Sequence, residues 1–468
     1  MQYSPTRSSG GATPTVAFET LGCKLNQYES DSIATELVRR GYTVTDGDSG
    51  ADVYVVNSCT VTNKADRKSR NTLNRAVRRV GDDGVVILTG CFVDSHREAL
   101  VGSAATYVVD NTHKNTIPEL LDAHFRGEVV DPDGLDPNVF GFAAPQRLFH
   151  TRTTIKVQDG CDNFCTFCII PFVRGRARSR PPREVLAEAR EAIRGGAREL
   201  VLTGVNMSRY AVRDAGATGA GATGTAEATP DETGITDFAG LVRAILDLPG
   251  DFRLRISSLE PDQLGPSFVD LFRHPRMCPH LHLCLQSGSD RVLLAMRRMY
   301  TVSQYLDVVR SLRELDPEFT ITTDLIVGFP GEGDEEFAES LTVVEAAEVS
   351  HVHMFPYSVR SGTRAERMPG HVEAGEKARR GRRVQEAATE RKRRIRERFV
   401  GRTVRVLVER CRHEAEHHVA EGFCEYYHPV TVTGFPASMP PEPNTFVTVR
   451  VTGLGAGDDP ALLASPVE

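Results

Sequence analysis

The chain has 468 residues, of which 40% are hydrophobic and none is tryptophan. This length exceeds what one hydrophobic core usually holds, and the composition excludes a fibrous or disordered protein, so we expect two to four globular domains. The net charge of −7 excludes a uniformly basic nucleic-acid-binding protein, although local basic segments remain possible.

The start of the chain, from Met1 to Thr15, is polar and lacks the basic and apolar regions of a signal peptide. No apolar run approaches the ~20 residues that cross a bilayer, so no membrane contact is expected. We therefore expect a cytoplasmic protein. In that reducing compartment, ten cysteines indicate metal or redox chemistry rather than disulfides.

Residues 15–121 predict a doubly wound α/β domain, after a disordered N-terminus at residues 1–14. Residues 122–146 contain a turn sequence, Asp131-Pro132-Asp133-Gly134, and are interpreted as a linker. The predicted strands of the domain are residues 15–18, 51–57 and 85–88, and its predicted amphipathic helices are residues 26–41 and 63–80.

Residues 147–376 predict a second α/β domain with six strand-helix units. Such a repeat is typical of a partial (βα)6 barrel of the TIM type. Residues 214–236 are rich in Gly, Ala and Thr and are predicted to be a flexible insertion without a catalytic role. The predicted strands are residues 153–157, 199–203, 253–257, 280–285, 319–327 and 351–356.

Residues 377–399 predict a basic helix with eleven Lys or Arg against four Glu, counted from Glu376. This helix either guides a nucleic acid or simply connects two domains. The alternating apolar segments of residues 400–468 predict a small β-barrel. Three of its aromatic residues are candidates for stacking on bases, although core packing is the commoner role: Phe423, Tyr426 and Tyr427.

The predicted C-terminal barrel also holds Cys411 and Cys424, with three histidines nearby, His413, His417 and His418. A zinc site is disfavoured, because the two cysteines lie thirteen residues apart and lack the paired spacing of zinc ligands. Cys278 has no recognised partner.

Cys161, Cys165 and Cys168 form the pattern C-x3-C-x2-C after the first predicted strand of the second domain. Three thiolates on one loop can bind three irons of a 4Fe-4S cluster and leave the fourth iron open. Zinc is the alternative, but a fourth ligand at zinc-finger spacing is missing nearby. The motif, with Phe167 before its last cysteine, resembles the radical S-adenosylmethionine superfamily, which implies S-adenosylmethionine on the open iron.

Residues 322–332, TTDLIVGFPGE, are similar to the superfamily motif that packs against the adenine of the cofactor. Glycines there would allow close backbone approach to a ligand. Without the cysteines, this segment would be interpreted as an ordinary turn after a strand. The resemblance implies cofactor contacts from Phe167, Thr203, Gly204, Ser257, Gln286, Asp324, Gly328 and Pro330.

Cys23, Cys59 and Cys91 each follow a predicted strand of the first domain. Because the carboxyl ends of parallel strands lie at one edge of a sheet, the three side chains can converge there. Three convergent thiolates would form a second open cluster site. The alternative is three small buried hydrophobic residues.

Together these features resemble the radical methylthiotransferases over nearly the whole chain, including a C-terminal barrel of the TRAM type. The resemblance implies two 4Fe-4S clusters. Cys161, Cys165 and Cys168 would hold the radical-generating cluster, and Cys23, Cys59 and Cys91 would hold the cluster that carries the transferred sulfur. One S-adenosylmethionine would supply the methyl group and a second the radical, converting a C-H bond of adenine to C-S-CH3.

Four strings resemble the branch that acts on N6-threonylcarbamoyladenosine next to the tRNA anticodon: TLGCKLNQYESD, NSCTVTNKADRKSR, CDNFCTFCIIPFVRGRARSR and HLHLCLQSGSDRVLLAMRRMYT. The isopentenyladenosine branch usually opens with GCQMN, and the ribosomal-protein branch with GCPKN. At Cys284 the family often has Pro or another small residue, so Cys284 is expected to be a packed strand residue rather than a ligand.

Three alternatives stay open at this point. Two are methylthiolation of isopentenyladenosine in tRNA and methylthiolation of a ribosomal-protein aspartate. The third is an iron-sulfur protein that binds RNA or senses redox state without transferase activity.

Five arginines lie between Phe172 and Arg183 with no carboxylate among them, so their charge must meet solvent or an anion. Beside the cysteine motif they are predicted to contact tRNA phosphates, with a solvated charged face as the alternative. The resemblance implies the tRNA anticodon loop, an electron donor and a sulfur source as partners, and a monomer is expected. The predicted RNA contacts are Arg174, Arg176, Arg178 and Arg180.

Overall fold

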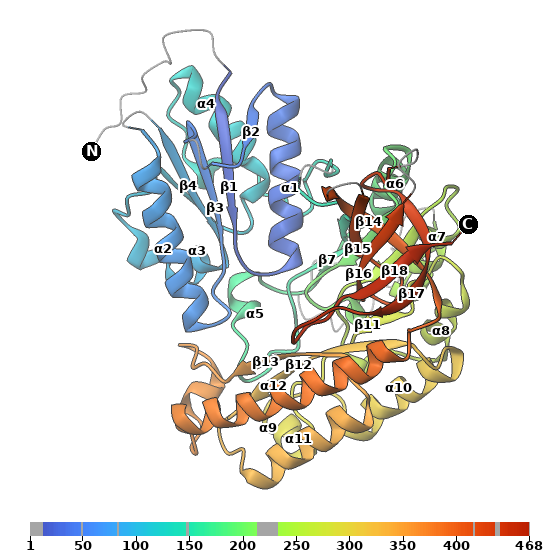
Figure 1. The fold of residues 1–468 in the computed structure, drawn as a ribbon. Coiled ribbons are helices and arrows are strands. Elements are labelled where there is room, and N and C mark those ends of the chain that lie inside the picture. Colours follow the sequence, from blue (N-terminus) through green and yellow to red (C-terminus); the bar gives the residue numbers. More distant parts are fainter. Residues whose placement is uncertain are drawn as a thin grey trace.

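The computed structural model describes residues 13–47, 50–81, 84–146, 149–212, 233–414, 417–435 and 440–467. An N-terminal α/β part, a central α/β part and a C-terminal β-barrel pack against one another (Figure 1). Most of the predicted N-terminal tail and most of the predicted insertion at residues 214–236 lie outside the described residues.

The N-terminal part is a parallel sheet with the strand order β2-β1-β3-β4-β5 and helices on both faces. Val16, Val55 and Leu120 belong to the apolar layer under α1 and α4, while Val56 and Leu73 belong to the layer under α2 and α3. The predicted doubly wound fold is therefore confirmed. The elements are β1 (Thr15–Thr20), α1 (Lys24–Arg39), β2 (Thr43–Thr45), β3 (Val53–Ser58), α2 (Asn63–Arg79), β4 (Val85–Gly90), α3 (Cys91–His96), β5 (Tyr107–Val109) and α4 (Ile117–Arg126).

The central part is an open barrel, which in the described residues has six main parallel strands in the order β6-β9-β10-β11-β12-β13. Parallel bridges from Leu254 to Met277 and from Leu259 to Leu283 join its two halves. All six strands coincide with predicted strands: β6 (Thr153–Lys156), β9 (Glu199–Thr203), β10 (Arg253–Ile256), β11 (His280–His282), β12 (Thr320–Val327) and β13 (His351–Pro356).

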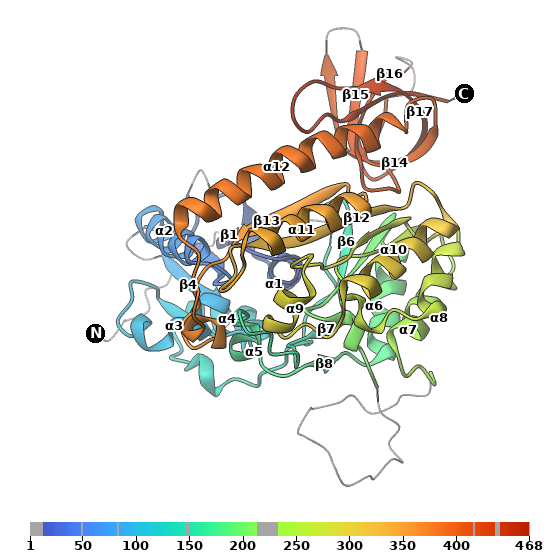
Figure 2. The same cartoon turned by 90° about the horizontal axis from the view of Figure 1, so that it is seen from below.

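Helices cover the outside of these strands (Figure 2). Apolar side chains of the strands and helices share one large core, in which Ile155, Leu202 and Leu325 are fully buried. The helices are α6 (Pro182–Arg194), α7 (Phe238–Leu246), α8 (Pro266–Val269), α9 (Asp290–Ala295), α10 (Val302–Leu315) and α11 (Asp334–Ala346), and the short elements after β6 are β7 (Gln158–Asp159), α5 (Ile170–Val173) and β8 (Arg178–Ser179).

The basic helix α12 (Ala374–Glu397) packs along β13 and leads to the C-terminal barrel (Figure 2). Arg380 lies 2.6 Å from Glu332, and Arg391 lies 2.6 Å from Glu345 in α11. Arg396 pairs with Asp459 of the C-terminal barrel at 2.7 Å. Because carboxylates of other elements meet many of its charges, α12 acts as a connector between two parts of the molecule.

The C-terminal barrel is closed, with the strand order β14-β15-β16-β18-β17 among the described residues. Neighbouring strands are antiparallel except β16 and β18, which are parallel. The predicted small β-barrel is thus confirmed, with strands β14 (Thr403–Glu414), β15 (His417–Phe423), β16 (Pro429–Phe435), β17 (Phe446–Leu454) and β18 (Leu462–Pro466).

Two arginines of β10 dock this barrel onto the central part. Arg253 and Arg255 both pair with Glu199 of β9, at 2.6 and 2.7 Å. Their remaining N-H groups donate to main-chain carbonyls of the C-terminal barrel, among them those of Phe423 and Glu425. The interface therefore rests on a buried ion-pair group as well as on apolar contact.

The three aromatic residues that were candidates for base stacking lie at this same interface. Tyr427 stacks on Phe423 with ring centroids 5.2 Å apart, and the Arg255 guanidinium lies 4.8 Å from the Tyr427 ring. The Tyr426 hydroxyl donates to Asp316 at 2.9 Å. All three residues therefore pack at the interface with the central part, which is the commoner role of such aromatic residues.

Within the described ranges, no helix is long and apolar enough to cross a membrane.

Candidate active site

The first cysteine triad lies at the carboxyl edge of the N-terminal sheet. Cys23 directly precedes α1, Cys59 directly follows β3, and Cys91 is the first residue of α3 after β4. Since β1, β3 and β4 are parallel neighbours, the three cysteines share one edge of the sheet. Helix N-termini favour negative charge, which suits thiolates at Cys23 and Cys91.

Two glycines bring the chain close to Cys59. Gly22 has φ +96°, and a Cβ atom there would lie 2.9 Å from the Cys59 Sγ. Gly90 has φ +100°, and a Cβ atom there would lie 2.3 Å from the Ser58 carbonyl oxygen. No other residue type fits either position without shifting backbone or sulfur. Sequence reasoning missed this role, although Gly22 and Gly90 each directly precede a cysteine in the sequence.

Asn26 of α1 ties the same loops together. Its side-chain amide donates to the carbonyls of Leu21, at 2.7 Å, and of Ser58, at 2.9 Å. In return, the Asn57 amide donates to the Asn26 carbonyl at 2.9 Å. These bonds fix the loops that carry Cys23 and Cys59 relative to each other.

A buried ion-pair network lies behind the triad, between the N-terminal and central parts. Glu29 accepts from Lys114 at 2.5 Å and from Lys156 and Arg174 at 2.9 Å, and Arg174 also pairs with Asp159. Among the described residues the network holds three cations and two carboxylates, an excess of one positive charge. Excess positive charge next to buried thiols favours an anionic, thiolate-bound group.

The surroundings of Cys59 and Cys91 set the protonation of these two thiols. Burial raises the pKa of Cys91, and the charges of Arg174 and Lys114 oppose that rise. Burial likewise raises the pKa of Cys59, to about 11. Such thiols stay protonated at neutral pH unless a metal takes the place of the proton, so the donor set fits iron binding.

The second triad lies on the loop between β7 and α5. Gly160 opens this loop with φ +69°, and a Cβ atom there would lie 1.9 Å from the Arg176 carbonyl oxygen. The loop can therefore fold back closely on the segment after α5. Burial raises the pKa of Cys161 to about 11 and also raises the pKa values of Cys165 and Cys168.

Polar groups surround these sulfur atoms. The Arg298 guanidinium donates to the Cys165 Sγ at 3.2 Å and pairs with Glu260 at 3.0 Å. Glu260 accepts in turn from the Asn163 side chain at 2.6 Å, and the Asn163 backbone N-H donates to the Cys161 Sγ at 3.5 Å. Hydrogen bonds to sulfur stabilise thiolates and tune a bound cluster. Sequence reasoning did not identify Arg298 or Glu260, which are distant in the chain.

Both triads fit a cluster better than a single metal ion. None of the ten cysteines, all of which the structure describes, forms a disulfide. In the described residues, neither triad is a set whose ligand atoms all lie within 4.8 Å of one another. A 4Fe-4S cluster binds each thiolate to a different iron and so needs a wider set than one ion does.

A cavity of about 280 Å³ contacts the surroundings of both triads. Val61 and Thr62, which follow Cys59, form one wall, and Cys168 lies in another. Cys91 packs against Ile169, which also lines this cavity. A substrate placed here would thus lie near both sets of cysteines. Of the eight predicted cofactor contacts, three line the cavity: Phe167, Gln286 and Asp324.

The other five predicted cofactor contacts do not line this cavity. Thr203 and Ser257 share a hydrogen bond of 3.4 Å at the ends of β9 and β10, and Gly204 packs against Met207. Gly328 leaves space for the Lys377 side chain, whose Cγ would lie 2.2 Å from an added Cβ. A side chain of α12 therefore fills the space beside the Gly328 Cα, and the cofactor contact of Gly328 stays a prediction. Pro330 is buried beyond the same turn.

Two of the four predicted RNA-binding arginines, Arg174 and Arg180, need correction. Arg174 is 3% exposed and belongs to the Glu29 network, and Arg180 is 6% exposed and pairs with Glu188 of α6. Arg178 is half-buried and donates to the Arg174 carbonyl. Arg176 alone among these four is exposed, and it pairs with Asp162 at 3.1 Å. Carboxylates outside the segment, rather than phosphate, meet the charges of Arg174 and Arg180.

Models of two protein families match the chain. The radical SAM superfamily matches residues 155–344. A family described as uncharacterized protein family UPF0004 matches residues 15–110. The two matches cover the two cysteine triads separately.

Curated relatives match over most of their length. A threonylcarbamoyladenosine tRNA methylthiotransferase, MtaB, of Thermotoga maritima is 38% identical over 88% of this chain and 90% of its own. The protein of the same name in Bacillus subtilis is 36% identical over 77% of both chains. A tRNA-2-methylthio-N6-dimethylallyladenosine synthase of Paraburkholderia xenovorans is 32% identical over 85% of this chain and 86% of its own.

Among solved structures, the chain is similar to the radical S-adenosylmethionine methyltransferase TsrM of Kitasatospora setae, with cobalamin and a 4Fe-4S cluster bound. The TM-score is 0.53 at 15% identity, covering 76% of this chain and 77% of that one. At this level of identity the likeness supports the fold alone.

Proposed function

Because the chain belongs to the MtaB-like branch of the radical S-adenosylmethionine methylthiotransferases, we propose that it converts N6-threonylcarbamoyladenosine next to the tRNA anticodon to its 2-methylthio derivative. The proposal is carried by the cavity that is lined by Cys168 of one triad and by residues that follow Cys59 or pack against Cys91 of the other. The C-H bond to be replaced is unactivated, so the reaction needs a cofactor-derived radical and a sulfur donor at one substrate.

Each triad has its own part in the proposal. Cys161, Cys165 and Cys168 hold one 4Fe-4S cluster, and the triad of Cys23, Cys59 and Cys91 holds a second. When bound, these clusters and S-adenosylmethionine supply the radical, the sulfur and the methyl group of the reaction. An electron donor and a sulfur source complete the set of partners, and the tRNA substrate implies action in the cytoplasm.

The residues of the chain position and shield the reaction. Ile169, Ile326 and Phe355 give the cavity apolar walls, which exclude water from a radical. Gln286 and Asp324 offer polar groups in the same walls and orient the cofactor or the adenine. Arg298, which donates to the Cys165 sulfur, stabilises negative charge on that thiolate.

The choice of substrate rests on the relatives and on the sequence strings. Relatives named for threonylcarbamoyladenosine reach 38 and 36% identity, and relatives named for dimethylallyladenosine reach 32 and 33%. The second group makes the isopentenyl type of adenosine the second candidate substrate.

Mass spectrometry of tRNA nucleosides from cells with and without the gene tests the proposal. We expect 2-methylthio-N6-threonylcarbamoyladenosine to disappear on deletion and to return on complementation. If it persists while the isopentenyl counterpart disappears, the substrate assignment is wrong and the chemistry stands.

A purified, reduced protein tests the reaction class separately. The proposal requires formation of 5'-deoxyadenosine from S-adenosylmethionine. An iron-sulfur protein that only binds RNA or senses redox state would form none.

A further inference from the structure

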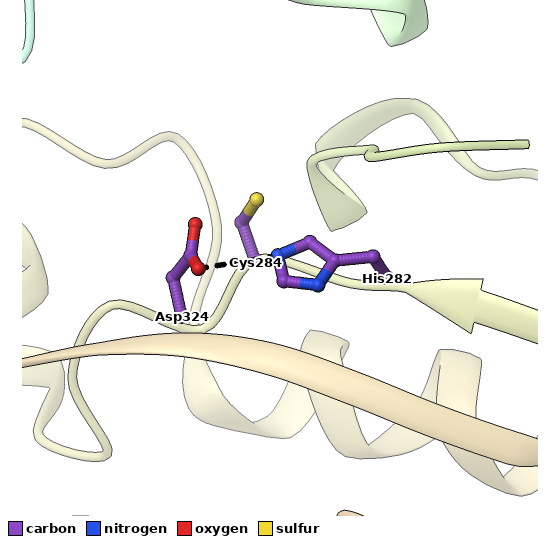
Figure 3. Close-up of side chains that lie close together, drawn as sticks. All are labelled: His282, Cys284 and Asp324. Atoms are coloured by element: carbon purple, nitrogen blue, oxygen red, sulfur yellow. Dashed lines mark ion pairs between the residues drawn. The ribbon is translucent and has the colours of Figure 1, made fainter. Parts of the chain in front are cut away.

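Three potential metal ligands converge inside the central barrel, beside the cavity but apart from both triads. His282 is the last residue of β11, Cys284 lies two residues later, and Asp324 lies on the neighbouring strand β12 (Figure 3). One ligand atom of each lies within 4.8 Å of those of the other two. In Figure 3 the His282 ring and the Asp324 carboxylate face each other along the dashed line, and Cys284 lies between them in this view.

The distances suit one small ion. The His282 Nε2 lies 3.4 Å from the Asp324 Oδ1. Around a tetrahedral zinc ion, with bonds of about 2.0 Å to nitrogen and oxygen and about 2.3 Å to sulfur, neighbouring ligand atoms lie about 3.3–3.5 Å apart. The nitrogen and the carboxylate oxygen thus already have the separation of two zinc ligands.

Neighbouring hydroxyl groups orient the ligands. The His282 Nδ1 lies 3.0 Å from the Thr322 Oγ1, so a hydrogen bond there leaves Nε2 free to bind a metal. The Ser258 Oγ lies 3.3 Å from the Cys284 Sγ. Metal-binding histidines commonly make a hydrogen bond like that of His282 to Thr322 through their second ring nitrogen.

The ligand types select the metal. Imidazole, thiolate and carboxylate together favour zinc over magnesium or calcium, which prefer oxygen ligands alone. A thiolate and a carboxylate also balance the charge of a divalent ion. The proposed ligand Cys284 is only 8% exposed, so little solvent competes for its sulfur.

We propose that His282, Cys284 and Asp324 bind one zinc ion, with a fourth position left for water or another ligand. Three protein ligands and one open position are the arrangement of catalytic rather than structural zinc sites. Asp324 also lines the cavity, and a carboxylate that binds zinc through one oxygen keeps its other oxygen for the cofactor or the adenine. The site does not depend on the function proposed above, because it rests on ligand geometry alone.

Sequence patterns point to this site only when the strand pairing is known. His282 and Cys284 are separated by one residue, the spacing that places two side chains on the same face of an extended chain. Asp324 comes from the adjacent parallel strand, where His282 is in register with Thr322. Cys284, expected to be only a packed strand residue, is thus assigned a ligand role.

The test measures metal content of the protein with its cysteine triads fully loaded with iron. The protein is incubated with Zn²⁺, freed of excess metal and analysed for iron and zinc. We expect about one zinc per chain in the wild type, and its loss in Cys284→Ala with iron unchanged. Cys278→Ala is the matched control, because Cys278 is also buried but belongs to no group of close metal ligands in the described chain.

Two results would overturn the assignment: no zinc in the wild type above the buffer background, or equal zinc in the wild type and Cys284→Ala. If Cys284→Ala also lost iron, Co²⁺ bound to the iron-loaded wild type would decide. A thiolate-to-cobalt absorption band supports the site, and bound cobalt without that band, or no bound cobalt, contradicts it.

Discussion

Cys59 and Cys165 belong to separate triads, so replacing each by alanine should stop the proposed reaction at a different point. Cys165→Ala should reduce formation of 5'-deoxyadenosine to background, because it removes a ligand of the radical-generating cluster. Cys59→Ala should retain that formation while sulfur insertion into tRNA is lost. Chromatography of the reduced reaction mixture and mass spectrometry of the tRNA measure both. Equal loss of 5'-deoxyadenosine in the two variants would contradict the separate roles.

Asp31 in α1 gives a pH-dependent prediction. Burial raises its pKa to about 7, whereas an unfolded aspartate titrates near 3.9. The folded state therefore binds the proton more tightly, and this residue's contribution to stability is full below about pH 4 and is lost as the pH rises to about 7.

Asp31→Asn should therefore raise the free energy of unfolding by about 1–2 kcal/mol at pH 8, after allowance for partial exposure, and change it little at pH 4. Urea unfolding at the two pH values measures the difference. Asp307→Asn is the control, because Asp307 is exposed and pairs only with Arg310 of the same helix among the interactions described. A gain that is equal at both pH values would rule out the ionisation as its cause.

At the scale of elements, Glu29 connects α1 to β6, to Lys114 and to the segment after α5. Arg174, Lys114 and Lys156 hold the pKa of its carboxyl well below the usual range despite burial. Glu29→Gln leaves three buried cations with Asp159 as their remaining carboxylate in the network.

We expect Glu29→Gln to lower the free energy of unfolding by about 3–5 kcal/mol, as when one partner of a buried ion pair is removed. Glu36→Gln in the same helix should cost about 0–1 kcal/mol, because its pairs with Arg39 and Arg40 are partly exposed. Denaturant unfolding of both variants measures the contrast. Similar losses of unfolding free energy in the two variants would show that the buried Glu29 network stabilises the fold no more than an exposed ion pair does.

Local periodicity was sufficient to predict β1, β3, β4 and the six main barrel strands, because each is either an apolar run or a segment in which apolar and polar residues alternate. The placement of cysteines at strand ends followed from the rules of parallel sheets. Tertiary partners could not be predicted. Arg174 meets Glu29 across 145 residues, and Gly328 meets Lys377 from another element. The edge strand β2 was missed because its three residues are too few for a pattern.

At the scale of the whole molecule, Arg255 links two parts of the chain. It is fully buried, pairs with Glu199 and donates to the carbonyls of Cys424 and Glu425. Arg255→Met should loosen the C-terminal barrel, because it removes these charged hydrogen bonds and leaves the carbonyls without their donor.

Amide hydrogen exchange measures this loosening. We expect exchange in residues 417–435 to become at least about tenfold faster, since one charged hydrogen bond contributes about 1.5–3 kcal/mol. Arg273→Met, at an exposed site whose ion pair is with Asp270, is the control and should leave exchange unchanged. Unchanged exchange in Arg255→Met would mean that apolar contact alone holds the barrel.

The strand order of the C-terminal barrel has a consequence for the timing of folding during synthesis. β18 lies between β16 and β17 and closes the barrel, yet among the five barrel strands it is the last to leave the ribosome. Until then, β16 and β17 expose unpaired edges while the segments that carry both cysteine triads are already complete. Iron can therefore be acquired before the barrel closes, and the stage before β18 is added is the one at which a nascent chain is most exposed to pairing with another chain.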